Sequence, residues 1–474
     1  MDNKEASSGE YRTGKVILIS FVAALGGFLF GYDSGVINGT VSALQDAFDS
    51  DEVGTGFNVA SMLLGCAAGA FFAGSLADKV GRRGAMFIAA LAFMFSAWGS
   101  GVADSSATFV FFRIIGGLAV GAASILAPAY ISEVAPASIR GRLATLQQLM
   151  IVIGLLASFT SNYFIATFAG GASIEHWFGF EAWRWMFWME LIPATLFFVL
   201  LFFIPESPRY LVAAGKFELA ESVLEKIIPW EPVKQKIADI KETVEKDRRP
   251  RLSDLINRAT KKIYPIVWIG LALAILQQLT GINIVFYYGA VLWQAAGFEE
   301  ADALLTNILS GTVNLIFTFV AIALIDKVGR RMLLLIGSLG TAISLGLLAI
   351  LFGTAGLDAD GNLDLNQTQA VLSLVFANSF VAFFAFTWGP VMWVLLGEIF
   401  PNKIRGAALA VSGLIHWLSN FTVTMTFPIM LAGIGLGFSY AIYAVFGFIA
   451  FFFVKAFVRE TKGRTLEDIS RSNM

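Results

Sequence analysis

Long apolar runs separated by polar segments dominate the chain. A helix that crosses a bilayer needs about 20 mostly apolar residues. Runs of about that length follow one another at 16–38, 57–77, 84–103, 107–132, 143–168, 186–204, 265–293, 303–325, 332–354, 369–397, 405–430 and 436–457. The pattern predicts twelve transmembrane helices, with a longer polar stretch between the sixth and the seventh.

That polar stretch, 205–262, has an apolar spacing of its own. Helix-like intervals separate Leu211, Phe217, Ala220, Val223, Leu224 and Ile227. The spacing predicts short solvated helices that link two halves of the protein. Binding of lipid headgroups or of a partner protein is the alternative.

Lysine and arginine are concentrated in the termini and in every second loop, including 205–262. The alternate loops hold only Arg184 and are otherwise acidic, with Asp46, Asp51 and Glu299 among their residues. Short basic loops stay on the cytoplasmic side. The charge pattern therefore predicts that both termini and the polar stretch are cytoplasmic, as in a multi-pass protein of the plasma membrane.

The second half of the chain repeats motifs of the first. Asp78-Lys-Val-Gly-Arg-Arg83 follows the second run, and Asp326-Lys-Val-Gly-Arg-Arg331 follows the eighth. Such a repeat implies two bundles related by an axis along the membrane normal, which rock around a central site. We therefore predict an all-α membrane protein of two six-helix bundles, 1–204 and 263–474, joined by a cytoplasmic helical linker, 205–262.

Acids and arginines recur at matching inner ends of the two halves. They are Asp78, Arg82, Arg83, Glu133 and Arg140 in the first half, and Asp326, Arg330, Arg331, Glu398 and Arg405 in the second. We interpret them as a cytoplasmic gate of ion pairs that closes the inner side and separates when it opens. The alternative is that these residues only keep their loops on the cytoplasmic side of the membrane. That role would explain the arginines but not the acids at matching positions.

Composition agrees with a membrane protein. Of the 474 residues, 57% are hydrophobic and 14% charged, against about 25% charged in soluble proteins. The net charge of −2 gives no reason to expect a nucleic-acid partner. The apolar run beginning at Val16 is too long for a signal peptide, and the single cysteine, Cys66, allows no internal disulfide.

Charge inside a membrane span is costly and indicates function, and two of the charged residues in the predicted spans stand out. Asp33 in the first span and Arg113 in the fourth both lie roughly 7–9 Å below the outer boundary, so they are expected to pair. Burial favours the neutral carboxyl and the arginine favours the carboxylate. This balance suits coupling to a proton, and a static buried pair is the alternative.

A second group of polar side chains is uncharged and includes tryptophans. Its members are Gln148, Gln277, Gln278, Asn283, Asn314, Trp393, Trp417 and Asn420. Amides both donate and accept hydrogen bonds, which suits sugar hydroxyls, and indole faces suit the apolar face of a pyranose. Hydrogen bonding between helices is the alternative.

Two spans contain points where the helix is expected to break. Gln278 and Asn283 lie about 140° apart on a straight helix, so both face one site only if the chain unwinds near Gly281. Gly389-Pro390 in the tenth span gives a second weak point. We expect both breaks to act in gating.

Several motifs together resemble the sugar porter family of the major facilitator superfamily, over nearly the whole chain. They are Gly-Tyr-Asp33, the two Gly-Arg-Arg loops, Glu133 through Arg142, Pro205-Glu206-Ser-Pro-Arg209, Gln277-Gln-Leu-Thr-Gly-Ile-Asn283, Trp388-Gly-Pro and Glu398-Ile-Phe-Pro401. The family includes bacterial proton symporters for xylose, galactose and glucose, and mammalian facilitative glucose transporters. The resemblance implies that Tyr288 joins Gln148, Gln277, Gln278, Asn283, Asn314, Trp393 and Asn420 at the sugar site, and that Glu206 joins the cytoplasmic gate.

Two departures from the family pattern stand out. His416 replaces a usual glutamine or asparagine beside Trp417 and is expected to fill the place of the amide; a change of sugar preference is the alternative. Arg459 replaces a usual proline in Arg459-Glu-Thr-Lys-Gly463, from which little effect is expected. In the family, an acid at the position of Asp33 is typical of proton symporters.

The sequence thus predicts a glucose- or xylose-like monosaccharide transporter that works as a monomer by alternating access, coupled to protons through Asp33. A passive facilitator is the main alternative, and a sugar sensor is less favoured. Because there is no nucleophile–base or metal-ligand cluster, no enzyme activity, metal or cofactor is expected; Asp358–Asp364 only partly imitates a calcium loop. Asn38-Gly-Thr and Asn366-Gln-Thr match the glycosylation pattern, the first too close to a span for modification.

Overall fold

A computed structural model describes residues 2–136, 139–227, 233–246, 251–257, 260–357 and 363–462. The first half contains α1 (Asp2–Val36), η1 (Ile37–Gly39), α2 (Val41–Phe48), α3 (Glu52–Val80), α4 (Arg82–Val102), α5 (Ser106–Val134), α6 (Arg140–Ala169), η2 (Trp177–Gly179), α7 (Ala182–Trp188), α8 (Leu191–Leu200) and η3 (Leu201–Phe203). The linker contains α9 (Pro208–Ala213), α10 (Phe217–Ile227), α11 (Val233–Lys246) and η4 (Leu252–Leu255).

The second half is built in the same way. It contains α12 (Pro265–Leu279), α13 (Ile282–Ala295), α14 (Glu300–Val328), α15 (Arg330–Thr354), α16 (Gln367–Phe386), α17 (Trp388–Ile399) and α18 (Asn402–Phe457). Two strands of two residues each, β1 (Gly356–Leu357) and β2 (Leu363–Asp364), pair antiparallel between α15 and α16. This hairpin is the one departure from the all-α prediction among the described residues, and the imitation of a calcium loop lies mostly outside them, at 358–362.

Twelve spans can be recognised in the described part of the chain. Eleven helical segments are long and apolar enough to cross a membrane. The last of them, Lys403–Phe457, covers 55 residues and contains Gly435 with φ 76° and ψ 173°, so it consists of two helices meeting at a break. The predicted count and order of the spans are confirmed.

One of the two predicted helix breaks lies where it was expected, and the other does not. α12 ends at Leu279 and α13 begins at Ile282, and Gly281 between them has φ 78°. Glycine adopts this left-handed conformation at little cost. The second break lies at Thr387 (φ −127°, ψ −91°), not at Gly389-Pro390. The prediction there was displaced because proline is tolerated in the first turn of a helix, and Pro390 lies in the first turn of α17.

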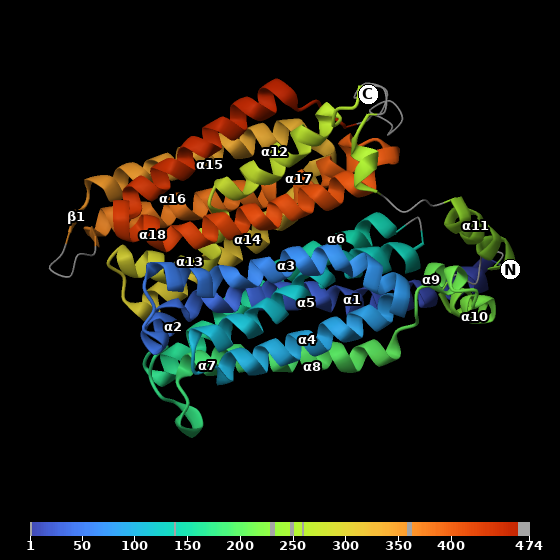
Figure 1. The fold of residues 1–474 in the computed structure, drawn as a ribbon, viewed down its shortest axis with the longest axis horizontal. Helices are drawn as coiled ribbons and strands as arrows, with labels where there is room; N and C mark the ends of the chain where they lie inside the picture. Colours follow the sequence, from blue (N-terminus) through green and yellow to red (C-terminus); the bar gives the residue numbers. More distant parts are fainter. Residues whose placement is uncertain are drawn as a thin grey trace.

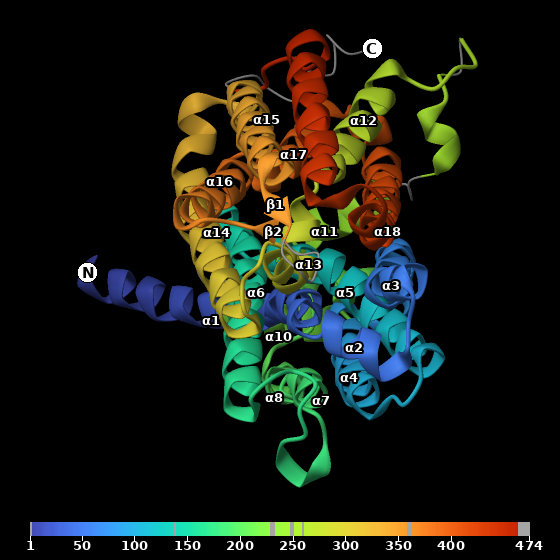
Figure 2. The ribbon, with the colours of Figure 1, turned by 90° about the vertical axis from the view of Figure 1, so that its left-hand side faces the viewer.

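The two halves pack side by side (Figure 1). In the first half α3 packs on α5 and α1 on α6; in the second, α15 and α12 pack on α18. Between the halves, α3 contacts α18 and α6 contacts α14. We call the end that carries α9–α11 the linker end, and the end that carries α2, α7 and β1 the far end (Figures 1 and 2).

Small residues let the helices of each half approach closely, as is usual in membrane proteins. A Cβ atom added to Gly117 would lie 1.9 Å from the carbonyl oxygen of Met62, and one added to Gly154 would lie 2.0 Å from that of Phe28. Since no real Cβ atom fits at such distances, glycine is required where α5 crosses α3 and where α6 crosses α1.

The linker forms the predicted short helices. Ala220, Leu224 and Ile227 of α10 are buried, as their spacing predicts. Phe217 is an exception, because its side chain is 42% exposed and lies under the Lys241 ammonium group, 5.9 Å from the ring centroid. The apolar face of α10 therefore excludes Phe217.

Candidate functional site

The predicted ion pair between Asp33 and Arg113 is present. Asp33 comes from α1 and Arg113 from α5, and each side chain is 1% exposed. One Arg113 nitrogen donates to the Asp33 carboxylate, and another donates to the Asp33 backbone oxygen at 3.1 Å. A Cβ atom at Gly116, one turn beyond Arg113, would lie 2.8 Å from the second Asp33 carboxylate oxygen, so glycine keeps room there.

A third charged residue, Glu190, adjoins this pair and was missed from the sequence. Glu190 lies between α7 and α8, is 1% exposed, and both of its carboxyl oxygens are buried without a hydrogen-bond partner among the described residues, as is the second carboxylate oxygen of Asp33. One arginine can neutralise one carboxylate, and an unpaired buried charge is expensive. The buried group of Asp33, Glu190 and Arg113 therefore contains one carboxyl group more than its arginine can neutralise. A single acid within an apolar run was the signal that could have found Glu190.

The amides around the α12–α13 break form one hydrogen-bonded cluster. The side-chain nitrogen of Gln277 donates to the backbone oxygen of Trp388 at 2.7 Å, which fixes α12 against the start of α17. The side-chain nitrogen of Asn283 donates to the side-chain oxygen of Gln278 at 2.6 Å. Gln278 and Asn283 thus meet because the helix breaks at Gly281, as predicted.

His416 of α18 completes the cluster. Its Nε2 atom lies 2.8 Å from the side-chain oxygen of Gln277 and 2.6 Å from the side-chain nitrogen of Gln278. A neutral imidazole nitrogen either donates or accepts, so Nε2 satisfies one of these two neighbours at a time. The side-chain nitrogen of Gln278 also donates to the side-chain oxygen of Gln277 at 3.3 Å, whereas the buried Nδ1 atom of His416 has no hydrogen-bond partner within the described part of the chain. The cluster therefore has hydrogen-bonding capacity left over.

Aromatic rings lie directly against this cluster. The His416 ring centroid is 5.0 Å from that of Trp393 and 5.5 Å from that of Trp417. Trp393 is 38% exposed, whereas Trp417 is buried and contacts Phe30 of α1 at 5.8 Å, across the two halves. The partly exposed indole of Trp393 therefore lies beside His416 and the amides that His416 contacts.

The remaining predicted site residues are placed differently. Asn420 is buried, and its amide donates to the hydroxyl of Tyr287 at 3.4 Å. Tyr288, the residue implied by the resemblance, is 1% exposed and donates to the backbone oxygen of Thr424. Asn314 is buried within α14, and Gln148 is half-buried on α6. Tyr287, and not the expected Tyr288, is thus the tyrosine that contacts an amide of the predicted site, that of Asn420.

At the linker end of the first half, Arg82 and Glu206 organise a polar network. Arg82 pairs with Asp78 at 3.1 Å and with Glu133 at 3.2 Å. The Glu206 carboxylate accepts hydrogen bonds from the backbone nitrogens of Arg82 and Arg83, at 3.0 Å and 3.1 Å. A carboxylate at a helix N-terminus is favourable, so Glu206 caps α4.

The second half repeats this network. Arg330 pairs with Asp326 at 2.9 Å and with Glu398 at 2.8 Å. The Glu460 carboxylate accepts from the backbone nitrogens of Arg330 and Arg331, at 2.9 Å and 3.0 Å, and so caps α15. Glu460 follows Arg459 directly and was not among the residues assigned to the gate from the sequence.

A hydroxyl follows each capping acid and completes the parallel. Ser207 donates to Glu133, and Thr461 donates to Glu398 at 2.6 Å. The signal for Glu460 was therefore present in the sequence as a repeated acid–hydroxyl pair after the sixth and twelfth spans. Of the other predicted gate residues, Arg405 donates to the backbone oxygen of Phe400, and the side chain of Arg140 lies outside the described residues.

Opposing influences act on the ionisation of Glu460. Partial burial raises the pKa of its carboxyl group, but backbone hydrogen bonds from Lys462, Arg330, Arg331 and Thr461 lower it. The net pKa lies below the ordinary value, so Glu460 is ionised at neutral pH and holds its position on α15 by charge-assisted hydrogen bonds.

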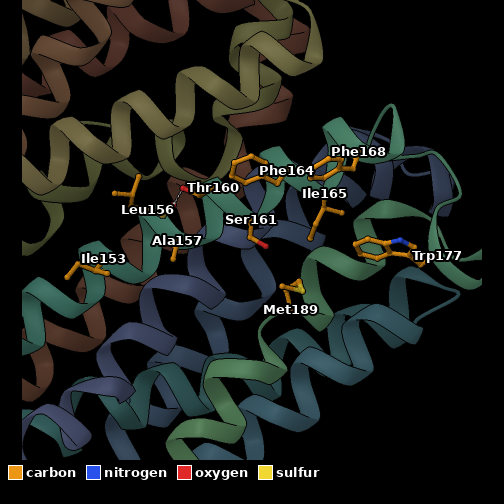
Figure 3. A pocket seen from close by; sticks show the side chains of 10 residues that line it. All are labelled: Ile153, Leu156, Ala157, Thr160, Ser161, Phe164, Ile165, Phe168, Trp177 and Met189. Carbon is orange, nitrogen blue, oxygen red and sulfur yellow. Dashed lines mark hydrogen bonds between the residues drawn. The ribbon is translucent and has the colours of Figure 1, made fainter. Parts of the chain in front are cut away.

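A groove of about 580 Å³ lies away from the polar cluster, between α6 and the segment from Trp177 to Met189 (Figure 3). Its lining is mostly apolar, and the hydroxyl of Thr160 already donates to the backbone oxygen of Leu156. Such a lining suits a hydrocarbon surface better than a sugar. The predicted site residues lie elsewhere.

Comparison with known proteins decides the family. A family model described as "Sugar (and other) transporter" matches residues 19–472. This chain belongs to the sugar porter family. The glucose transport protein of Synechocystis sp. is 51% identical over 455 residues, 96% of this chain and 97% of the relative. The D-xylose-proton symporter of Escherichia coli is 41% identical over 492 residues, covering 97% and 96% of the two chains.

A solved structure supports the same assignment of the fold. The E. coli xylose transporter XylE, in a partially occluded inward-open conformation, matches with a TM-score of 0.82 and 39% identity. The match covers 95% of this chain and 99% of the other. The sugar porter described here is therefore a multi-pass membrane transporter with the major facilitator fold.

Proposed function

We propose that this sugar porter carries a monosaccharide such as glucose or xylose across the plasma membrane together with a proton, by alternating access. The observation that carries the proposal is the cluster of Gln277, Gln278, Asn283 and His416 next to the partly exposed indole of Trp393. The names of its relatives, a glucose transport protein and a D-xylose-proton symporter, support the class of solute.

Sugar binding would exchange hydrogen bonds rather than create charge pairs. The Nδ1 atom of His416 is buried without a hydrogen-bond partner among the residues that the structure describes, so a sugar hydroxyl, which both donates and accepts, can satisfy it. Leaving a site's buried polar groups unpaired is costly, which favours a solute that supplies hydroxyls. We propose that three further amides complete the sugar site as the halves close: Gln148, Asn314 and Asn420. Trp417 would provide a second aromatic ring against the sugar, and Tyr288 would support the site from behind.

Proton coupling is proposed to reside in Asp33, Glu190 and Arg113. Protonation of Asp33 weakens its attraction to Arg113, which frees α1 and α5 to shift relative to one another. Because two carboxyl groups compete for one guanidinium, the cluster can accept a proton without leaving a net charge buried. Passive facilitation remains the alternative, in which the same cluster is static.

The linker end is proposed to be cytoplasmic, with both termini inside, because the basic loops cluster there. The halves are proposed to be bounded at 1–204 and 263–474, with 205–262 as a cytoplasmic linker. Since one chain contains both halves, we propose that it works as a monomer in the bilayer, without a cofactor, a nucleic-acid partner or enzyme activity.

The two linker-end networks are proposed to form the cytoplasmic gate. Arg82 with Asp78 and Glu133, and Arg330 with Asp326 and Glu398, tie neighbouring helices within each half. A half that is tied in this way moves as a rigid unit, which alternating access by rocking requires. The same residues would meet across the halves when the linker end closes.

Uptake into liposomes tests the proposal. Purified protein should accumulate radiolabelled glucose or xylose when the exterior is more acidic than the interior, and a panel of unlabelled monosaccharides should compete. Uptake that equilibrates without regard to the pH gradient would favour the facilitator. Failure of every monosaccharide to be taken up or to compete would contradict the proposal as a whole.

A further inference from the structure

One amide side chain of the first half is inserted into a helix of the second half. Asn38 lies in η1, at the far end of α1, and is 1% exposed. Its side-chain nitrogen donates to the backbone oxygen of Phe286 at 3.0 Å. Its side-chain oxygen accepts from the backbone nitrogen of Ala290 at 3.0 Å and from the side chain of Asn307 at 2.7 Å.

Asn38 engages three backbone groups of α13, because its side-chain nitrogen also donates to the backbone oxygen of Val285 at 3.4 Å. The other two, at Phe286 and Ala290, are partners in a helix. Residues 286 and 290 are four apart in α13, and a helical nitrogen normally donates to the oxygen four residues earlier. An amide offers a donor and an acceptor together, so Asn38 can hydrogen-bond to both the oxygen of Phe286 and the nitrogen of Ala290. When Asn38 withdraws, these two backbone groups still have each other as hydrogen-bond partners.

Gly289 makes the insertion possible. A Cβ atom added there would lie 2.2 Å from the side-chain oxygen of Asn307 and 2.8 Å from the side-chain nitrogen of Asn38. The first distance is shorter than any real contact and involves a buried, hydrogen-bonded amide. A side chain at this position would therefore force Asn38 and Asn307 away from α13.

We propose that Asn38 is a removable clasp that holds the two halves together at the far end and controls the opening of the sugar site to that side. With the far end closed, Asn38 bridges Phe286, Ala290 and Asn307. On opening, the halves separate and the amide leaves, while α13, an uninterrupted helix from Ile282 to Ala295, keeps its backbone hydrogen bonds. Because α13 carries Asn283 and Tyr287 of the polar cluster, this release links the far-end contact to the site.

A second contact at the same end shows that the halves meet there. The Glu300 carboxylate of α14 accepts from the backbone nitrogen of Ala172, in the loop after α6, at 3.0 Å. Glu300 is only half-buried, whereas Asn38 is fully enclosed. Hydrogen bonds between buried groups exchange less readily with water, so the clasp rather than Glu300 is expected to set the balance between closed and open forms.

This inference rests on the proposed alternating access, but not on the identity of the solute or on proton coupling. It can be tested by the distance between two spin labels at the far end, without sugar and without a pH gradient. Ala107, in the first turn of α5, and Thr368, in the first turn of α16, are exposed and belong to different halves. The labels are attached to Ala107→Cys and Thr368→Cys in a Cys66→Ala background, in lipid nanodiscs.

The clasp variants are Asn38→Ala and Gly289→Ala, and the matched control is Asn162→Ala. Asn162 is also a buried amide that donates to a backbone oxygen, that of Val36 at 2.9 Å, but both residues lie in the first half. Gly289→Ala keeps Asn38 in the sequence but displaces its side chain sterically. This variant therefore provides an independent test if Asn38→Ala does not fold.

Both clasp variants should raise the ratio of separated to close label pairs about tenfold over the parent, which corresponds to about 1.4 kcal/mol, while Asn162→Ala stays within about twofold. A ratio unchanged in every clasp variant that folds would overturn the proposal. So would an equal rise in Asn162→Ala, because the effect would then be general loosening. Sugar uptake plays no part in this readout, so failure of the proposed function would leave its outcome unaffected.

Discussion

At the scale of single residues, the arrangement of the polar cluster depends on His416. Its Nε2 atom lies within hydrogen-bonding distance of both Gln277 and Gln278, and the Gln278 side-chain nitrogen also donates directly to the Gln277 side-chain oxygen at 3.3 Å. An asparagine or glutamine there would present a separate donor and acceptor, whereas the imidazole presents one group to both. The buried Nδ1 atom of His416 has no hydrogen-bond partner in the described ranges of the chain and is the group we expect a sugar hydroxyl to satisfy first.

Replacement of Gln277 tests this arrangement. Gln277→Ala removes the contacts with His416 and with the backbone of Trp388. We expect sugar affinity, measured by competition binding, to fall about tenfold or more, since a lost hydrogen bond in a buried site costs about 1–3 kcal/mol. Gln45→Ala, which removes an exposed amide of α2, should leave affinity unchanged. Equal affinity in both variants would contradict the assignment of the site.

Asp33 and Arg113 could be paired from the sequence because both are charged and both lie at one predicted depth. Glu190 lies at a similar distance from the boundary of its predicted span, 186–204, and could have been found by the same reasoning. The His416 contacts could not have been predicted, since they depend on how α12 and α18 are rotated against each other. Side-chain identity thus indicated the chemistry of the site, and packing determined its connections.

At the scale of elements, broken helices place the site. The residues before and after Gly281 belong to two helices, and a Cβ atom at Gly281 would lie 2.8 Å from the Tyr443 ring. Position 281 thus requires glycine for two reasons, its left-handed backbone conformation and its close contact with the Tyr443 ring. The sequence indicated this break through the required facing of Gln278 and Asn283, but misplaced the break before α17, because nothing in Phe386-Thr387-Trp388 resembles a usual helix breaker.

Gly281→Ala is expected to slow transport strongly. The variant strains the backbone at φ 78° and displaces Tyr443. The rate of sugar exchange in liposomes should fall about tenfold or more. Gly346→Ala in α15 has open space around it and should retain the parental rate. Parental exchange by Gly281→Ala would show that the break is not needed for gating.

The capping acids Glu206 and Glu460 should behave alike. Each caps the helix that follows a Gly-Arg-Arg motif, so Glu206→Gln and Glu460→Gln should each lower the thermal unfolding temperature of the purified protein at pH 7. Because the pKa of Glu460 is lowered in the folded state, its contribution to stability is present above the ordinary pKa and is lost as the pH falls through the lowered value.

The difference between the parent and Glu460→Gln should therefore shrink on acidification below about pH 4.5. Unfolding temperatures measured between pH 7 and pH 4 provide the readout. A difference that stays constant over this range would contradict the capping role of the ionised carboxylate.

At the scale of the whole molecule, the repeat of the two halves is the main organising feature. It was visible in the sequence as two identical six-residue motifs, and it extends in the structure to Glu206 with Ser207 and Glu460 with Thr461. The contact of Asn38 with α13 breaks this repeat, because it joins one half to the other. Such cross-half contacts were beyond prediction, since they depend on the conformation that the halves adopt.

The orientation of the molecule can be measured with single cysteines. In a Cys66→Ala background, Lys241→Cys in the linker should be protected from a membrane-impermeant maleimide added to intact cells, and Ala107→Cys at the far end should react. Disruption of the membrane should expose Lys241→Cys. The opposite labelling pattern would contradict the proposed cytoplasmic linker.

Proton-coupled sugar transport through Asp33 is the central claim, and a sugar-induced current tests it most directly. A proton that accompanies a neutral sugar carries one positive charge into the vesicle. A sugar jump over proteoliposomes on a solid-supported membrane, at equal pH on both sides, should therefore give an inward positive current that Asp33→Asn abolishes while sugar counterflow persists. Sugar counterflow without any current in the parent protein would contradict the account.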